Sequence, residues 1–211
     1  MHWVLVANGN MPAINIVRRL ETVDRWIGVD GGCRILDAWH ILPDLVIGDM
    51  DSVPTALLNQ YKKEHIPTLM YPSVKDETDL ELALNLALDS SPSRITILGA
   101  LGDRLDHTLA NVLLLSRCLE HGVPAKIMDD QQSIYLVDSY LELKGKPGDL
   151  FSLMPVKETI TGVTLSGLQY PLKDATLAFS SPQGLSNIFT SSQVVVQIQK
   201  GMALVFHQYA G

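Results

Sequence analysis

Short apolar segments alternate with longer helical patterns through residues 1–122, and this alternation constrains the fold more than any other feature. The apolar segments are nearly continuous, as expected of strands buried on both faces of a parallel sheet. The sequence therefore predicts an α/β domain whose parallel sheet is covered by helices on both faces. The expected strands are Trp3–Ala7, Trp26–Val29, Leu45–Ile47, Thr68–Tyr71 and Ile95–Leu98. The expected helices are Ile14–Leu20, Cys33–Trp39, Thr55–Lys63, Leu80–Leu88 and Thr108–Leu119.

After Gly122 the pattern changes to short strand-like segments separated by turn sequences such as Lys146-Pro147-Gly148-Asp149. Alternating side chains in Val194–Ile198 are typical of a half-buried strand. We therefore expect an α/β domain over residues 1–129, followed by an antiparallel β-sandwich domain over residues 130–211. The expected strands of the second domain are Ser133–Val137, Leu150–Met154, Thr161–Leu165, Ala175–Phe179, Val194–Ile198 and Ala203–Phe206.

Composition and charge exclude several classes of protein. The chain carries 16 basic and 23 acidic side chains, for a net charge of −7, which argues against a general nucleic-acid binder. An uninterrupted apolar run of about 18 residues, as a membrane-spanning helix requires, is absent from the sequence. The first residues lack the basic and apolar regions of a signal peptide, and two cysteines are too few for a disulfide scaffold. The expected setting is the cytoplasm, without membrane or nucleic-acid partners.

Aspartate outnumbers glutamate by 16 to 7, and many of the aspartates follow the expected strands. Ligands of an open parallel sheet bind beyond the carboxyl ends of its strands, so residues at those ends are candidates for a site. Four strand ends carry carboxylates, in Asp30-Gly31-Gly32, in Gly48-Asp49-Met50-Asp51-Ser52, in Lys75-Asp76-Glu77-Thr78-Asp79 and in the stretch from Gly99 to His107.

Asp49 and Asp51 are two residues apart, and on an extended strand end their carboxylates would point the same way. Two carboxylates that close repel each other unless a cation lies between them, and oxygen ligands suit Mg²⁺. A solvated turn with an aspartate cap explains the same pair without a ligand. Asp76 and Asp79 have a similar alternative, in which Asp76 caps the next helix and Asp79 lies in its first turn.

The glycines at these strand ends would let phosphate groups approach the backbone. They are Gly31, Gly32, Gly99 and Gly102. Arg104 is the expected cationic partner of a phosphate because its guanidinium can bind two oxygens at once. The chain has no phosphate-binding P-loop motif, so phosphates would have to be held by a metal ion and Arg104.

Taken in order, these motifs resemble the thiamine pyrophosphokinase family over essentially the whole chain. The match includes Asp30-Gly31-Gly32, Gly48-Asp49-Met50-Asp51-Ser52, Asp76-Glu77-Thr78-Asp79 and Gly102-Asp103-Arg104-Leu105-Asp106-His107. It continues in the second domain with Gly167-Leu168-Gln169-Tyr170 and Gly184-Leu185-Ser186-Asn187. The resemblance implies a Mg²⁺-dependent transfer of pyrophosphate from ATP to thiamine, and a homodimer in which thiamine lies between the α/β domain and the partner's β domain.

The resemblance also implies roles for individual residues. The expected metal ligands are Asp30, Asp49, Asp51, Asp76 and Asp79, and Asp49, Asp51 and Asp79 are the expected catalytic carboxylates. The expected nucleotide contacts are Asp30, Thr78, Arg104, Asp106, His107 and Asn111, with the four glycines. The expected thiamine contacts are Tyr170, Ser186 and Asn187. Two positions depart from the family pattern: Asp103 replaces a frequent glycine, and Tyr170 replaces a tryptophan of some members.

The sequence is also compatible with two other functions. A Mg²⁺-dependent phosphatase of the haloacid-dehalogenase type also uses an Asp-x-Asp pair, although its first aspartate follows the first strand and not the third. A non-catalytic module that binds nucleotide or thiamine would bind ATP without forming AMP.

Overall fold

The computed structural model describes residues 1–210, which divide into two compact units, the second beginning at Gln131. In the first unit the strands form a parallel sheet in the order β4-β3-β2-β1-β5-β6. Val4 of β1, for example, pairs with Trp26 of β2 on one side and with Thr96 of β5 on the other. The strands are β1 (His2–Val6), β2 (Arg25–Val29), β3 (Leu45–Gly48), β4 (Thr68–Met70), β5 (Arg94–Leu98) and β6 (Ala125–Met128).

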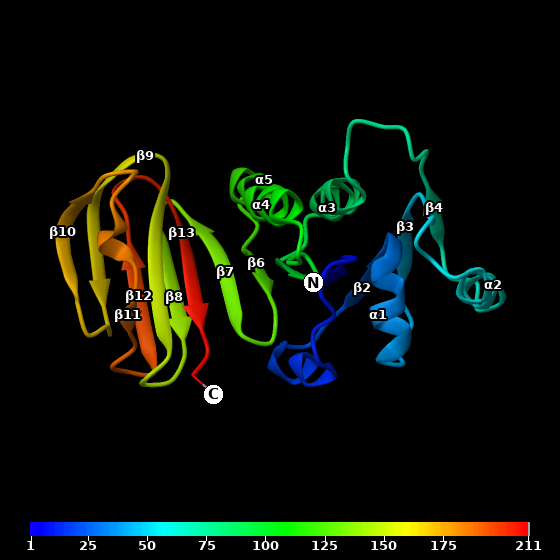
Figure 1. The fold of residues 1–211 in the computed structure, drawn as a ribbon, viewed down its shortest axis with the longest axis horizontal. Helices are drawn as coiled ribbons and strands as arrows, with labels where there is room; N and C mark the ends of the chain where they lie inside the picture. Colours follow the sequence, from blue (N-terminus) through cyan, green and yellow to red (C-terminus); the bar gives the residue numbers. More distant parts are fainter. Residues whose placement is uncertain (211) are drawn as a thin grey trace. The chain divides into compact units, whose positions relative to one another are not determined.

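Helices cover both faces of this sheet. Since crossover connections between parallel strands are right-handed, the connections from β1 to β4 lie on one face and those that lead to β5 and β6 lie on the other. In Figure 1, α3, α4 and α5 lie together on one side of the strands, and α1 lies on the opposite side. The helices are η1 (Ile14–Arg19), η2 (Asp30–Gly32), α1 (Cys33–Ala38), α2 (Thr55–Lys63), α3 (Asp79–Asp89), α4 (Leu105–Leu113) and α5 (Leu115–Glu120).

Apolar side chains from alternate strand positions fill the space under each layer of helices. Val4 and Val6 of β1 pack with Ile35 and Leu36 of α1, while Leu5, which points to the opposite face, is also fully buried. Helix α3 buries a stripe with helical spacing against β1, β2 and β3. The residues of that stripe are Leu80, Ala83, Leu84, Ala87 and Leu88.

The second unit is a β-sandwich whose two sheets share one long strand. The first part of β9 pairs with β13 and β11, while its last part pairs with β12 and β10. Strand β7 extends the first sheet beside β13, and β8 extends the second beside β12. The elements are β7 (Gln132–Val137), β8 (Tyr140–Lys144), β9 (Leu150–Ser166), β10 (Leu172–Leu177), η3 (Pro182–Gly184), β11 (Asn187–Ile188), β12 (Gln193–Gln197) and β13 (Lys200–Gln208).

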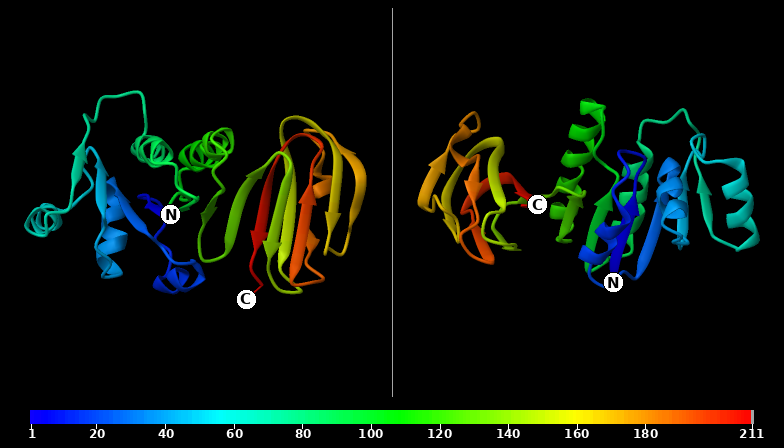
Figure 2. Two further views of the ribbon diagram at one scale, coloured as in Figure 1. Left: turned by 180° about the vertical axis from the view of Figure 1, so that it is seen from behind. Right: turned by 60° about the horizontal axis from the view of Figure 1, so that its bottom comes forward.

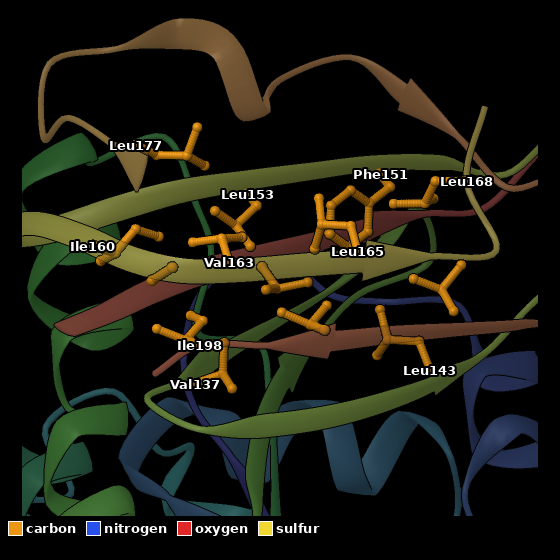
Figure 3. Packing of buried hydrophobic residues seen from close by; sticks show 14 of the residues in the cluster. Val137, Leu143, Phe151, Leu153, Ile160, Val163, Leu165, Leu168, Leu177 and Ile198 are labelled. Carbon is orange, nitrogen blue, oxygen red and sulfur yellow. The ribbon is translucent and has the colours of Figure 1, made fainter. Parts of the chain in front are cut away.

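The core of the sandwich lies between its two sheets (Figure 3). Phe151 and Leu153 from the first part of β9 face Val163 and Leu165 from its second part, and all four are almost completely buried. The two halves of β9 thus belong to different sheets, and their side chains pack against each other in the core. Figure 2 shows the strands of this unit from two further directions.

The α/β domain followed by a β-sandwich confirms the fold class predicted from the sequence. Four details differ. The segment Ile14–Leu20 forms a 3₁₀ helix, and the helix expected over Thr108–Leu119 is divided at Leu114 into α4 and α5, with α4 beginning at Leu105. The separate strands expected at Leu150–Met154 and Thr161–Leu165 are one continuous strand, β9. Strands β6, β8 and β11 were not predicted.

Within residues 1–210, no helix has both the length and the apolar character needed to cross a membrane.

Candidate active site

A cavity of about 580 Å³ lies at the carboxyl edge of the parallel sheet, within the first unit. Its walls include residues 7–10, which follow β1, and residues 99–104, which follow β5. The strand order reverses between these two strands, since β2, β3 and β4 lie on one side of β1 while β5 and β6 lie on the other. Such a reversal leaves a crevice where open α/β sheets bind ligands.

Three aspartates converge on one wall of this cavity. One carboxylate oxygen each from Asp30, Asp49 and Asp79 lies within 4.8 Å of the other two. Asp30 follows β2, Asp49 follows β3, and Asp79 begins α3. The fold thus brings together three aspartates that are distant in the sequence. We call Asp30, Asp49 and Asp79 the carboxylate triad.

The backbone around Asp30 is adapted to this convergence. Asp30 has a left-handed conformation with φ of 43°, and it is 8% exposed. The N–H of Ser52 donates a hydrogen bond to its Oδ1 at 3.4 Å. A Cβ added at Gly48 would lie 3.0 Å from the Cβ of Asp30, so the glycine at the end of β3 leaves room for this side chain.

Asp49 and Asp51 do not form the extended pair that the sequence predicts. Strand β3 ends at Gly48, and Met50 has a left-handed φ of 65°, so the chain turns between the two aspartates. The N–H of Asp51 donates to Asp49 Oδ1 at 3.2 Å, and this bond holds the pKa of Asp49 below its usual value. Asp51 itself is exposed, accepts a hydrogen bond from the Ser52 hydroxyl, and does not line the cavity.

Asp79 is the member of the triad that forms an ion pair. Burial raises the pKa of Asp79, and the ammonium of Lys75 opposes that rise. Lys75 Nζ lies 3.0 Å from Asp79 Oδ1. This oxygen is buried and, apart from the ion pair with Lys75, has no hydrogen-bond partner in the described residues. The sequence gives no signal for Lys75, because it lies in the loop before α3, where the spacing rule for ion pairs on a helix does not apply.

Helix α3 begins with a side-chain cap that fixes the position of Asp79. Thr78 is the N-cap residue, and its hydroxyl oxygen accepts a hydrogen bond from the N–H of Glu81 at 3.2 Å. The alternative in which Asp76 caps this helix is wrong, because Thr78 takes the cap position, but Asp79 does lie in the first turn as that alternative has it. Asp76 is exposed and lies outside both the triad and the cavity wall.

The residues predicted to contact nucleotide divide into two groups. Several of them line the cavity: Asp30, Thr78, Gly99, Gly102, Arg104, His107 and Asn111. Gly31, Gly32 and Asp106 do not. A Cβ at Gly32 would collide with the backbone oxygen of Val6, so close packing of the chain by itself requires a glycine here. Sequence inspection cannot distinguish this reason for a glycine from approach to a ligand.

Side chains from α4 organise the loop that follows β5. Asn111 Nδ2 donates to the backbone oxygen of Ala100 at 2.7 Å, and the Gly102 N–H donates to the hydroxyl of Thr108 at 3.1 Å. At the start of α4 the guanidinium of Arg104 makes two hydrogen bonds to the carboxylate of Asp106, at 2.7 and 3.3 Å, and both side chains are exposed. Asp103 also lines the cavity.

The three residues predicted to contact thiamine lie together in the second unit. The N–H of Tyr170 donates to Asn187 Oδ1 at 2.9 Å, and Asn187 Nδ2 donates to the Tyr170 backbone oxygen at 2.8 Å. Asn187 is 6% exposed, whereas Tyr170 is 61% exposed. Ser186 has a left-handed φ of 58°, and its N–H donates to the hydroxyl of Ser152 at 3.2 Å. The amide of Asn187 thus holds the backbone of Tyr170, while the exposed phenol accepts a hydrogen bond from Nε2 of the neighbouring Gln169 at 3.3 Å.

The carboxylate triad fits a divalent cation of the Mg²⁺ type. It offers oxygen ligands only, and Mg²⁺ is commonly held by one or two carboxylates together with water and substrate phosphates. The buried Oδ1 of Asp79 already needs a cation beside it, and in this structure the Lys75 ammonium is that cation. Repulsion among three close carboxylates is likewise relieved by a cation.

Comparison with known proteins matches both units to a single family. Residues 17–127 match the family model described as "Thiamin pyrophosphokinase, catalytic domain", and residues 138–203 match "Thiamin pyrophosphokinase, vitamin B1 binding domain". The chain belongs to the thiamin pyrophosphokinase family. The family that the sequence motifs resemble is thereby confirmed.

Individual thiamin pyrophosphokinases resemble the chain over most of its length. The thiamine pyrophosphokinase of Bacillus subtilis (strain 168) is 33% identical over 183 residues, which cover 85% of each chain. A crystal structure of the thiamine pyrophosphokinase from Bacillus subtilis has a TM-score of 0.90 and 27% identity, covering 100% of both chains. A second, from Geobacillus thermodenitrificans, has a TM-score of 0.85 and 25% identity, covering 100% of this chain and 99% of that one.

Membership of the thiamin pyrophosphokinase family gives no support to the two alternative functions. In the structure the Asp49-Met50-Asp51 stretch follows β3, not the first strand as the phosphatase alternative requires. A purely binding module is likewise unsupported, because the region matched over residues 17–127 is a catalytic domain.

Proposed function

We propose that this protein transfers the pyrophosphoryl group of ATP to the hydroxyl of thiamine, giving thiamine diphosphate and AMP. The observation that carries the proposal is the carboxylate triad, on the wall of a cavity inside the region that matches the family's catalytic domain. The α/β domain would hold ATP and the metal ion, and the β domain would hold thiamine and form the dimer interface.

The residues around the cavity have separate tasks in this reaction. Asp30, Asp49 and Asp79 would hold Mg²⁺, and the bound ion supplies positive charge that offsets the charge of the triphosphate. Arg104 stands at the start of α4, where its guanidinium and the helix N-terminus favour phosphate oxygens. The loop between β5 and α4 is held in place by Asn111 and Thr108, so its backbone is ordered before substrate binds.

The chemical step is an in-line attack of the thiamine hydroxyl oxygen on the β-phosphorus of ATP. A bond forms between that oxygen and the β-phosphorus, and the bond from the β-phosphorus to the oxygen bridging toward the α-phosphorus breaks. AMP leaves with the bridging oxygen. The hydroxyl proton passes to a nearby carboxylate, for which members of the triad are the candidates. Catalysis of this kind depends mainly on positioning and on charge stabilisation.

Thiamine would bind beside Tyr170, whose exposed ring can stack on the cationic thiazolium ring. We propose further that the protein is a cytoplasmic homodimer, with thiamine between the α/β domain of one protomer and the β domain of its partner. Sedimentation measures the oligomeric state, and a monomer at working concentrations that is still active would refute the shared site.

Incubation of the purified protein with ATP, MgCl₂ and thiamine tests the reaction. Equal amounts of AMP and thiamine diphosphate, measured by chromatography, are the expected result. Release of inorganic phosphate without AMP would contradict the proposal and favour a phosphatase. Binding of ATP with no product would favour a binding module.

A further inference from the structure

Lys75 lies on the loop between β4 and α3 and contacts the carboxylate triad directly. Its Nζ is 3.0 Å from Asp79 Oδ1, and it also donates a hydrogen bond to the backbone oxygen of Pro72 at 2.9 Å. The side chain is only 12% exposed. These two contacts hold the ammonium group in a defined position on the cavity wall.

The wall of the cavity is mainly acidic, and Lys75 is the cation that contacts the triad. Carboxylates outnumber the permanently charged cations on the wall, where Lys75 and Arg104 face Asp30, Asp49, Glu77, Asp79 and Asp103. Arg104 makes its ion pair with Asp106, which lies outside the triad. Among the ion pairs of residues 1–210, the one between Lys75 and Asp79 is the one that reaches the triad.

A divalent cation and the Lys75 ammonium would compete for Asp79. The Oδ1 atom of Asp79 is buried and has no hydrogen bond that could replace this ion pair. Two cations placed on the same small group of carboxylates repel each other strongly in a partly buried site. Binding of the metal ion therefore weakens the hold of the triad on Lys75, whose flexible side chain can turn toward another anion.

We propose that Lys75 is an exchangeable counterion, which pairs with Asp79 in the free enzyme and moves to a phosphate oxygen of ATP when the metal and nucleotide bind. This inference rests on the proposed function for the identity of the nucleotide. Before substrate arrives, the ion pair with Lys75 compensates one of the three negative charges of the triad. The exchange then places one positive charge beside the group that is transferred.

Metal binding without nucleotide tests the first half of the exchange. Mn²⁺ alone is titrated into the wild type and into Lys75→Met, Lys75→Arg and Arg104→Met variants, and the dissociation constant is measured by calorimetry. We expect Lys75→Met to bind Mn²⁺ about tenfold more tightly, because its competing charge is gone. Arg104→Met removes the same charge from the cavity wall without touching the triad, so it should change Mn²⁺ affinity much less. Lys75→Arg should resemble the wild type.

Unchanged or weaker Mn²⁺ binding by Lys75→Met would overturn the proposal, since Lys75 would then be a structural support for Asp79. Equal gains in Mn²⁺ affinity in Lys75→Met and Arg104→Met would overturn it as well, because loss of any positive charge near the cavity would then explain both results. Circular dichroism verifies that each variant is folded. If Lys75→Met is not folded, Lys75→Gln, which also removes the charge, replaces it with the same expected gain in Mn²⁺ affinity.

Kinetics tests the second half. We expect Lys75→Met to raise the KM for ATP and to lower kcat/KM by about tenfold or more, as for the loss of a hydrogen bond to a charged group. The exposed Lys63→Met on α2 is the matched control and should leave both constants unchanged. Wild-type KM and kcat/KM in Lys75→Met would refute the move to phosphate. A wild type that forms no AMP would instead refute the proposed function, while the Mn²⁺ comparison would still report on the ion pair.

Discussion

His207 and Asp149 form a buried hydrogen bond in the β-sandwich, with His207 Nε2 and Asp149 Oδ2 2.7 Å apart and both side chains 4% exposed. The backbone N–H groups of Lys146 and Ala210 also donate to this carboxylate, at 2.9 and 2.8 Å. The His207 ring stacks on Phe189, with centroids 4.5 Å apart. One carboxylate therefore ties together the turn before β9, the last strand and the residues after it.

Replacement of Asp149 by asparagine should destabilise the protein at neutral pH by about 2 kcal/mol, because an amide cannot accept all three donors and leaves a buried N–H unpaired. Burial raises the pKa of Asp149, but the hydrogen bonds from His207, Ala210 and Lys146 outweigh it and hold the pKa below the usual value. A lowered pKa stabilises the fold above the unfolded-state pKa of about 3.9, and this stabilisation disappears as the pH falls through the folded-state value.

The difference in free energy of unfolding between wild type and Asp149→Asn should therefore have its full size at pH 7 and become smaller below about pH 4. Urea unfolding at several pH values measures it. Asp138→Asn, in which an exposed aspartate of the same unit changes, is the control. A gap in unfolding free energy that does not depend on pH would show that the charge of Asp149 is unimportant.

Within the triad, Asp49→Asn and Asp79→Asn should each lower kcat by about 10²-fold or more, since each removes a charge aimed at the proposed metal ion. Asp51→Asn should cost much less, because its exposed carboxylate lies outside the triad. Asp89→Asn, at the exposed far end of α3, serves as the control for Asp79→Asn. Steady-state rates over a range of Mg²⁺ concentrations separate the variants. If Asp51→Asn lowers kcat as much as Asp49→Asn does, both aspartates act together at the metal ion, as the sequence predicts.

The sequence predicts α2 with the bounds observed, Thr55–Lys63, and it places carboxylates correctly at the carboxyl ends of the parallel strands. Both results follow from local patterns of apolar residues. The choice among the aspartates could not be predicted, because it depends on the left-handed turn at Met50 and on the first residue of α3.

Long-range pairing explains a second difference from the predicted elements. Pro155, Lys157 and Glu158 suggest an interruption between two strands, yet β9 continues through them. Pairing with β13 holds the chain at both ends of this stretch, with Ala203 opposite Pro155 at its start and, after a shift in register, Lys200 opposite Thr161 beyond its end. Such support comes from residues distant in the sequence, so a local pattern cannot reveal it.

Two glycines that the sequence assigns to phosphate binding should behave differently when replaced by alanine. Gly32→Ala places a methyl group against the Val6 backbone oxygen and should lower the free energy of unfolding by about 2 kcal/mol or more. A Cβ at Gly102 has its nearest neighbour at 3.6 Å, so Gly102→Ala should fold normally. Because Gly102 lines the cavity, its alanine variant should instead raise the KM for ATP. Thermal unfolding and ATP kinetics on both variants check this, and equal stability of the two would contradict the packing role of Gly32.

Tyr170 offers a test of the proposed thiamine contact that leaves the nucleotide site untouched. Its ring is exposed while its backbone is held by Asn187, so removal of the ring should not disturb the fold. We expect Tyr170→Ala to raise the KM for thiamine about tenfold, as for loss of a stacked cationic ring, with little change in the KM for ATP. Tyr170→Phe should retain most of the affinity, and Tyr170→Trp should equal or exceed the wild type, because an indole face attracts cations more strongly. Tyr140→Ala removes another exposed tyrosine of the β-sandwich and provides the control. A Tyr170→Ala variant with wild-type KM for thiamine would mean that thiamine binds elsewhere.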